Sequence, residues 1–81
     1  MLRIAAKTKY TPEEVIKKAT KFFGPDGYKL KIINQTDTSV NFEGGDGTIE
    51  ISACAENGKT TVDFISREWD FQVNEFIKAI R

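Results

Sequence analysis

The sequence contains no histidine and one cysteine, and these shortages limit the chemistry that it can carry. Without histidine, the chain lacks the commonest general base, the Ser-His and Cys-His nucleophile pairs, and the ligand of most zinc sites. Its one cysteine, Cys54, has no second thiol for an internal disulfide, which is typical of the reducing cytoplasm. We therefore predict a non-enzymatic cytoplasmic protein that uses no cofactor and no metal.

Long apolar runs and an excess of charge of one sign are also absent. The longest apolar runs have only a few residues, so none would span a bilayer. Twelve Lys and Arg balance twelve Asp and Glu, which is unlike a dedicated nucleic-acid binder. The first seven residues contain no extended apolar stretch, so we expect no signal peptide. Residues 1–81 are expected to form a single soluble domain, with neither nucleic acid nor membrane among its partners.

Residues 12–23 have the start signal and the apolar spacing of an amphipathic helix. Thr11 can cap this helix, Pro12 suits its first position, and Glu14 completes a capping box. A Gly-Pro pair then ends the helix. One stripe is predicted to face the core, and it consists of Val15, Ala19, Phe22 and Phe23, with Ile16 at its edge.

A second amphipathic helix is predicted over residues 66–81. Its apolar residues recur at helical spacing and are expected to be buried: Trp69, Val73, Phe76, Ile77 and Ile80. Phe71 lies on the opposite side of this helix, where it interrupts an otherwise polar surface.

Residues 28–64 have the pattern of four short strands, and residues 2–8 that of a fifth, because alternate residues are apolar. An Asn-Gly pair at 57–58 favours a two-residue hairpin turn. This turn sets Ile51 opposite Phe64, on one face of the predicted sheet.

The two other turns extend the same apolar face. A four-residue turn at 44–47 sets Phe42 opposite Ile49, and a loop at 35–37 sets Leu30 opposite Phe42. A slip of one residue in any of these pairings would move the apolar side chains to the other face. The sheet is therefore predicted to have one apolar face and one polar face.

These elements predict an α+β fold, in which an antiparallel meander sheet of four to five strands is covered on one face by two helices. The element order is β-α-β-β-β-β-α, and we expect the first strand to pair with the last strand. This order resembles a shortened helix-grip domain, the START-like or polyketide-cyclase architecture, in which a sheet curls around a C-terminal helix.

The predicted function is that of a small protein-interaction module, acting as a homodimer or with a protein partner. An exposed aromatic residue within a polar rim is typical of an interaction anchor. The candidate surface is the outer side of the second helix, formed by Arg67, Glu68 and Phe71.

A different interpretation is a small-molecule binding protein with an apolar pocket between the sheet and the C-terminal helix. The candidate lining residues are Phe42, Phe64, Trp69 and Phe76. A pocket normally includes a few placed polar groups, and these four residues are also the ones expected to fill the core. The interaction module is therefore the preferred hypothesis.

Overall fold

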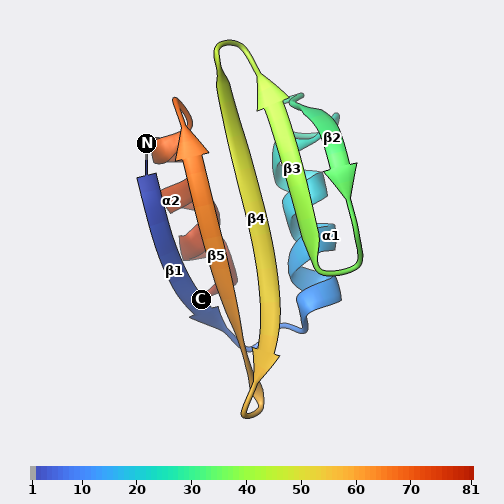
Figure 1. Ribbon diagram of the computed structural model, residues 1–81, viewed down its shortest axis with the longest axis vertical. Coiled ribbons are helices and arrows are strands. Elements are labelled where there is room, and N and C mark those ends of the chain that lie inside the picture. The colour runs from blue at the N-terminus through green and yellow to red at the C-terminus, as the bar shows by residue number, and fades with distance from the viewer. Residues whose placement is uncertain (1) are drawn as a thin grey trace.

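A five-stranded antiparallel sheet forms one layer of the molecule, and two helices form the other (Figure 1). The computed structural model describes residues 2–81, and Met1 lies outside them. The strand order is β1-β5-β4-β3-β2, which confirms the predicted α+β fold and the pairing of the first strand with the last. The elements are β1 (Leu2–Thr8), α1 (Pro12–Phe23), β2 (Lys31–Gln35), β3 (Ser39–Gly44), β4 (Gly47–Glu56), β5 (Lys59–Arg67) and α2 (Asp70–Ile80).

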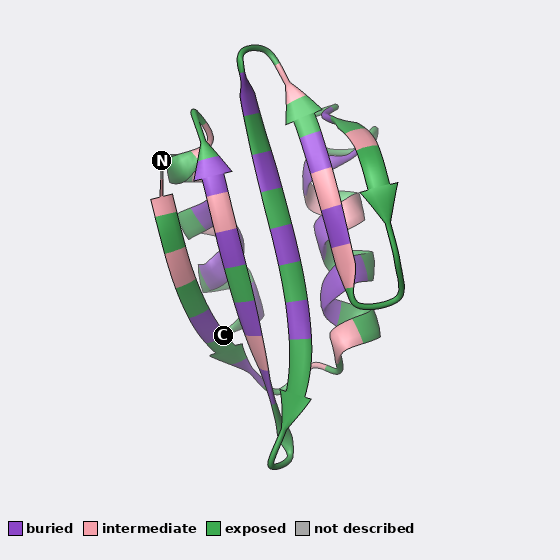
Figure 2. Ribbon diagram, in the orientation of Figure 1, coloured by how far each residue is buried: buried purple, intermediate pink, exposed green. Residues whose placement is uncertain are grey.

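The two helices lie side by side over one face of the sheet. Helix α1 packs on β3 and β4, while α2 packs on β5 and β1. Each of the three central strands alternates buried residues with half-buried or exposed ones, so that one face points into the core and the other away from it (Figure 2). Neither helix in residues 2–81 is both long and apolar enough to cross a membrane.

Two of the three predicted strand registers are confirmed. Ile51 lies opposite Phe64, and Phe42 lies opposite Ile49. Both pairs are buried at the centre of the core, where a slip of one residue would expose them.

The third register, at β2, was predicted wrongly. Phe42 pairs with Ile32 rather than with Leu30, and the pairing shifts again at a bulge around Ile33. The cause lies in the preceding loop, where the amide of Leu30 donates to the carbonyl oxygen of Phe23 at 2.8 Å. Residues 28–30 are therefore bonded to the end of α1 and not to β3, and β2 starts only at Lys31.

Helix α1 begins as its sequence predicts. The amide of Glu14 donates to the Thr11 hydroxyl at 3.2 Å, and the Thr11 amide donates to the Glu14 carboxylate at 3.0 Å. The hydrogen bond that the Glu14 carboxylate accepts from the Thr11 amide is the main cause that lowers the pKa of the Glu14 carboxyl, with smaller contributions from the Thr11 hydroxyl and from the charges of Lys18 and Lys17. One detail of the stripe differs, since Ile16 is fully buried whereas Phe22 is only half-buried, at the side that faces α2.

Helix α2 starts later than predicted. Residues 66 and 67 belong to β5, because this strand is paired on both sides and Ser66 lies opposite both Leu2 and Ile49. Glu68 then takes a left-handed backbone conformation, with φ of 70°, and turns the chain toward the helix. Trp69 is the residue before the first helical turn, so it is half-buried at the margin of the core instead of lying in the buried stripe.

Candidate interaction surface

Phe71 is the most exposed large hydrophobic residue in the described part of the chain. Its exposed fraction is 68%, against 52% for Ile33 and 42% for Tyr28. It lies in the first turn of α2, on the side opposite the buried stripe that packs on the sheet. No apolar neighbour in residues 2–81 covers it enough to bury it, so its position is not explained by packing of the core.

Arg67 and Glu68 lie close to Phe71 in the chain. The prediction that they lie on the outer side of the helix was wrong, because neither residue belongs to the helix. Arg67 ends β5, and Glu68 forms the turn between β5 and α2. Both are exposed, as is Asp70 at the start of α2. The candidate surface is thus built from a strand end, a turn and a helix start, all at one end of the molecule (Figure 1).

Trp69 fixes the geometry of this end. Its indole N–H donates to the carbonyl oxygen of Gly44 at 3.1 Å, which ties the β3–β4 hairpin to the turn before α2. Its ring makes an edge contact with Tyr28, with 6.0 Å between the ring centroids. A β-carbon at Gly47 would clash with the carbonyl oxygen of Arg67, so only glycine permits this close approach.

Three of the four residues proposed to line a ligand pocket fill the core instead, and the fourth, Trp69, lies half-buried at its margin. Phe42, Phe64 and Phe76 are each about 1% exposed. The Phe64 and Phe76 rings meet at 6.0 Å between centroids, and Phe23 lies 5.5 Å from Phe42 and 5.4 Å from Phe76. The rings occupy the space between sheet and helices where the pocket was expected.

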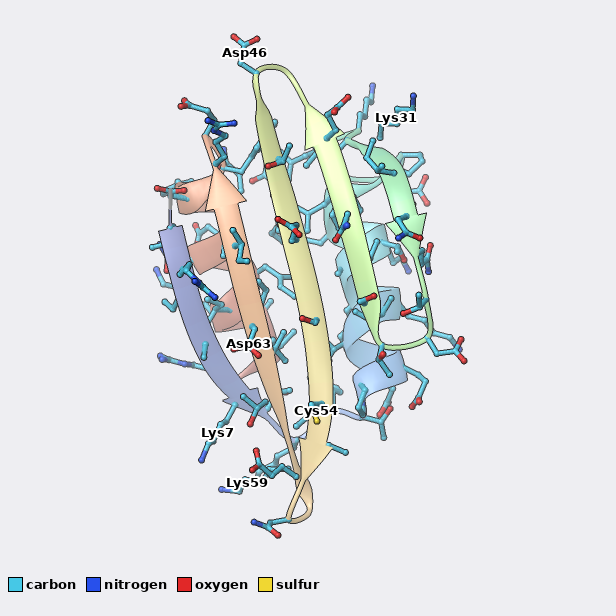
Figure 3. All side chains as sticks on the ribbon, viewed as in Figure 1. Lys7, Lys31, Asp46, Cys54, Lys59 and Asp63 are labelled. Carbon is cyan, nitrogen blue, oxygen red and sulfur yellow. The ribbon has the colours of Figure 1, made fainter. Side chains whose placement is uncertain are left out.

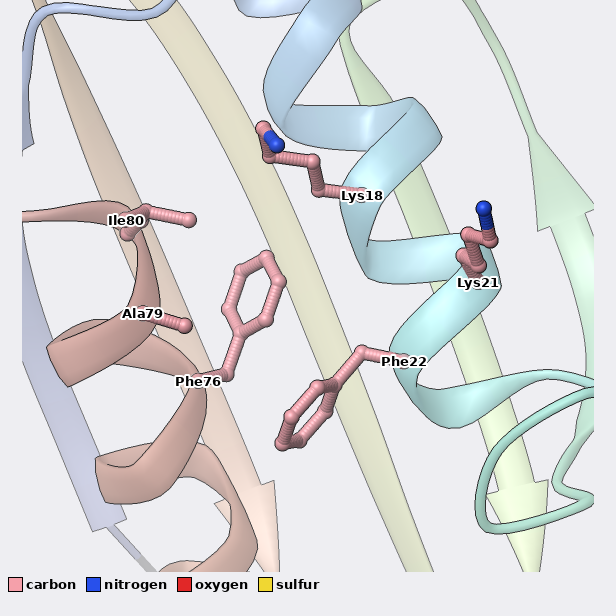
Figure 4. A pocket seen from close by; sticks show the side chains of 6 residues that line it. All are labelled: Lys18, Lys21, Phe22, Phe76, Ala79 and Ile80. Atoms are coloured by element: carbon pink, nitrogen blue, oxygen red, sulfur yellow. The ribbon is translucent and has the colours of Figure 1, made fainter.

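A groove of about 290 Å³ lies between the two helices on the outer surface of their layer (Figure 4). The Phe22 and Phe76 rings are among its lining residues and contact each other, with 5.4 Å between centroids. The ammonium group of Lys18 is held 4.5 Å from the centre of the Tyr10 ring. We call this feature the interhelix groove, and its lining residues are Lys18, Lys21, Phe22, Phe76, Ala79 and Ile80.

The interhelix groove was not among the features predicted from the sequence. Phe22 was predicted to lie in the buried stripe, as if the helix packed only against the sheet. The available signal was the position of Phe22 at one margin of the stripe, next to Lys18 on the helix surface. A half-buried aromatic residue beside lysines is expected where the packing between two helices is incomplete and a groove remains.

The sheet face away from the helices is polar, as predicted. Asp63 and Cys54 are exposed on this face, and Lys7 and Lys59 extend near its β4–β5 hairpin end (Figure 3). The Cys54 thiol is free. In residues 2–81, no three potential metal ligands from His, Cys, Asp and Glu come together.

Comparison with known proteins finds a solved structure with a similar fold but assigns the chain to no family. No protein-family model matches the chain, and no curated protein matches it in sequence. Its structure is similar to that of the Aha1 dimer from Colwellia psychrerythraea, determined in solution. The TM-score is 0.62 at 14% sequence identity, and the match covers 99% of this chain and 96% of that chain. At this level of identity, the likeness concerns the arrangement of helices and strands.

Proposed function

We infer that this chain is a small non-enzymatic interaction module that acts by pairing with a second copy of itself. The exposed side chain of Phe71 is the observation that carries this proposal. Exposed aromatic residues on an otherwise polar surface are enriched among the anchors of protein interfaces. Arg67 and Glu68 supply polar groups near this anchor, as the rim of an interface commonly does.

Two further observations support self-association. The structural neighbour from Colwellia psychrerythraea is a dimer, and it has the same small fold over nearly its whole chain. The core of the present chain is already filled by its phenylalanines, so binding at the surface is favoured over binding inside. The proposal includes a cytoplasmic location, for which the free, exposed thiol of Cys54 is the supporting observation.

The test is a comparison of self-association in two matched truncations. Phe71→Ala is expected to raise the dissociation constant of the dimer on the order of 30-fold or more, as truncation of an interface anchor does. Ile33→Ala removes a comparably exposed apolar side chain from the bulge in β2, at the far edge of the sheet, and is expected to leave the constant unchanged. An equal effect of both substitutions would remove Phe71 as the anchor.

A further inference from the structure

The interhelix groove and the Phe71 ring are both apolar and lie on the same side of the molecule. Phe71 projects from α2 away from the sheet, and the groove opens between α1 and α2 on the outer surface of the helix layer. The groove has an apolar floor formed by Phe22 and Phe76, which is suited to an aromatic ring. One copy of the chain thus carries both an unburied ring and an unfilled hollow.

Their charges are complementary. The side chains at the groove rim that carry charge are those of Lys18 and Lys21, and no carboxylate is among the lining residues. Phe71, in contrast, is preceded by two exposed carboxylates, Glu68 and Asp70. With Arg67 also nearby, the two carboxylates leave the rim around the ring net acidic, and it would face a basic rim around the groove, an arrangement that favours the correct pairing of surfaces.

We propose that Phe71 of each copy inserts into the interhelix groove of the other copy, in a twofold-symmetric dimer. This inference rests on the proposed self-association and names the two surfaces that make it. Phe71 of one copy contacts the groove of its partner, and Phe71 of the partner contacts the groove of the first copy. Because both contacts form within one pair, the assembly closes as a dimer and does not extend into a filament.

The spacing along α2 fits this arrangement. Phe71 and Ala79 lie eight residues apart, or about 12 Å along the helix axis. Two antiparallel copies of α2 would therefore place both insertions within one compact patch, with the twofold axis near residue 75. The charge of Glu75 at this position is already paired, since its carboxylate lies 3.7 Å from the ammonium group of Lys78.

A charge-swap experiment tests the pairing of these two surfaces. The groove variant carries Lys18→Glu and Lys21→Glu, and the ring variant carries Glu68→Lys and Asp70→Lys. Each variant alone would set like charges against each other, and we expect its dimer to weaken on the order of 10-fold to 100-fold. In an equimolar mixture both contacts again join opposite charges, so the heterodimer should form with an affinity near that of the wild type.

The outcomes distinguish a failure of the proposed self-association from a failure of the groove as the contact site. A wild-type chain that stays monomeric at every concentration would refute self-association itself. A wild-type dimer together with a mixture that associates no better than its components would leave self-association intact and overturn the groove as the site. Circular dichroism of each variant shows whether the four substitutions at exposed positions leave the fold unchanged.

A second pair of variants keeps the inference testable if a charge variant fails to fold. Phe71→Ala lacks the ring but retains the groove, and Ala79→Trp retains the ring but fills the groove from an exposed position. Each alone should lose both contacts, with a dissociation constant raised on the order of 100-fold. Their mixture retains one contact of two and should be roughly tenfold weaker than wild type; a mixture as weak as either variant would overturn the inference.

Discussion

The indole N–H of Trp69 donates to the carbonyl oxygen of Gly44, at 3.1 Å, across 25 positions of the chain. This hydrogen bond joins the end of β3 to the turn that leads into α2. Because Phe71 follows Trp69 by two residues, the same bond anchors the segment that presents the exposed ring. Folding of the hairpin and orientation of the candidate surface are thereby linked.

Replacing Trp69 with Phe should destabilise the fold by about 1–2 kcal/mol, because the partly buried carbonyl of Gly44 loses its donor. Urea denaturation measures the free energy of unfolding. Tyr28→Phe is the matched control, since it keeps the ring that contacts Trp69 and should change stability by less than about 0.5 kcal/mol. Equal losses for the two variants would argue against a role for the indole hydrogen bond.

The hydroxyl of Thr8 donates to the carbonyl oxygen of Ile80, and so connects the end of β1 to the last turn of α2. Thr8 is buried, so Thr8→Val would leave a helix-terminal carbonyl without this partner and should cost about 1–3 kcal/mol. Thr61→Val removes only a weak bond, at 3.5 Å, on the exposed face of the sheet. Thermal unfolding of both variants should show a clear fall in Tm for Thr8→Val alone.

The part of the fold that could be predicted from the sequence is the part specified by local turn chemistry. The Asn-Gly turn and the turn at 44–47 fixed the pairing of β3, β4 and β5, since each allows one register that buries alternate residues. The pairing of β2 could not be found in this way. It depends on hydrogen bonds from residues 28–30 to the end of α1, and on a bulge at Ile33, neither of which has a signature in the sequence.

The candidate site was predicted only in part, for a related reason. The helical spacing of α2 was enough to place Phe71 on the solvent side. The positions of Arg67 and Glu68 depend on where β5 ends, and strand pairing on both sides extends β5 beyond its apparent end. The interhelix groove depends on the distance between two helices, which periodicity within each helix does not specify.

The capping box of α1 predicts a pH dependence of stability. The pKa of Glu14 is lowered in the folded state by its hydrogen bonds with Thr11, so the ionised carboxyl stabilises the fold. This contribution is fully present above the ordinary pKa of about 4.5, and it is lost as the pH falls through the lower pKa of the folded state. The difference in Tm between wild type and Glu14→Ala should therefore shrink from pH 6 to pH 3; a difference that grows on acidification would contradict the sign.

Truncation of two phenylalanines in α2 should change the stability of the fold to very different extents. Phe76 is buried against Phe23 and Phe64, so Phe76→Ala should reduce the free energy of unfolding by about 3–5 kcal/mol. Phe71→Ala should change the stability of the monomer by less than about 0.5 kcal/mol, because the ring is exposed. Chemical denaturation at a concentration below the dimer dissociation constant checks both; a large loss for Phe71→Ala would mean that its ring supports the monomer.

The most direct test of self-association is the molar mass of the wild-type chain in solution. Light scattering coupled to size-exclusion chromatography would be recorded over a range of protein concentrations of about a thousandfold. We predict that the mass rises with concentration from 9.1 kDa to twice that value, and that Phe71→Ala shifts this rise to higher concentration. A mass of 9.1 kDa at every concentration would contradict the proposed function.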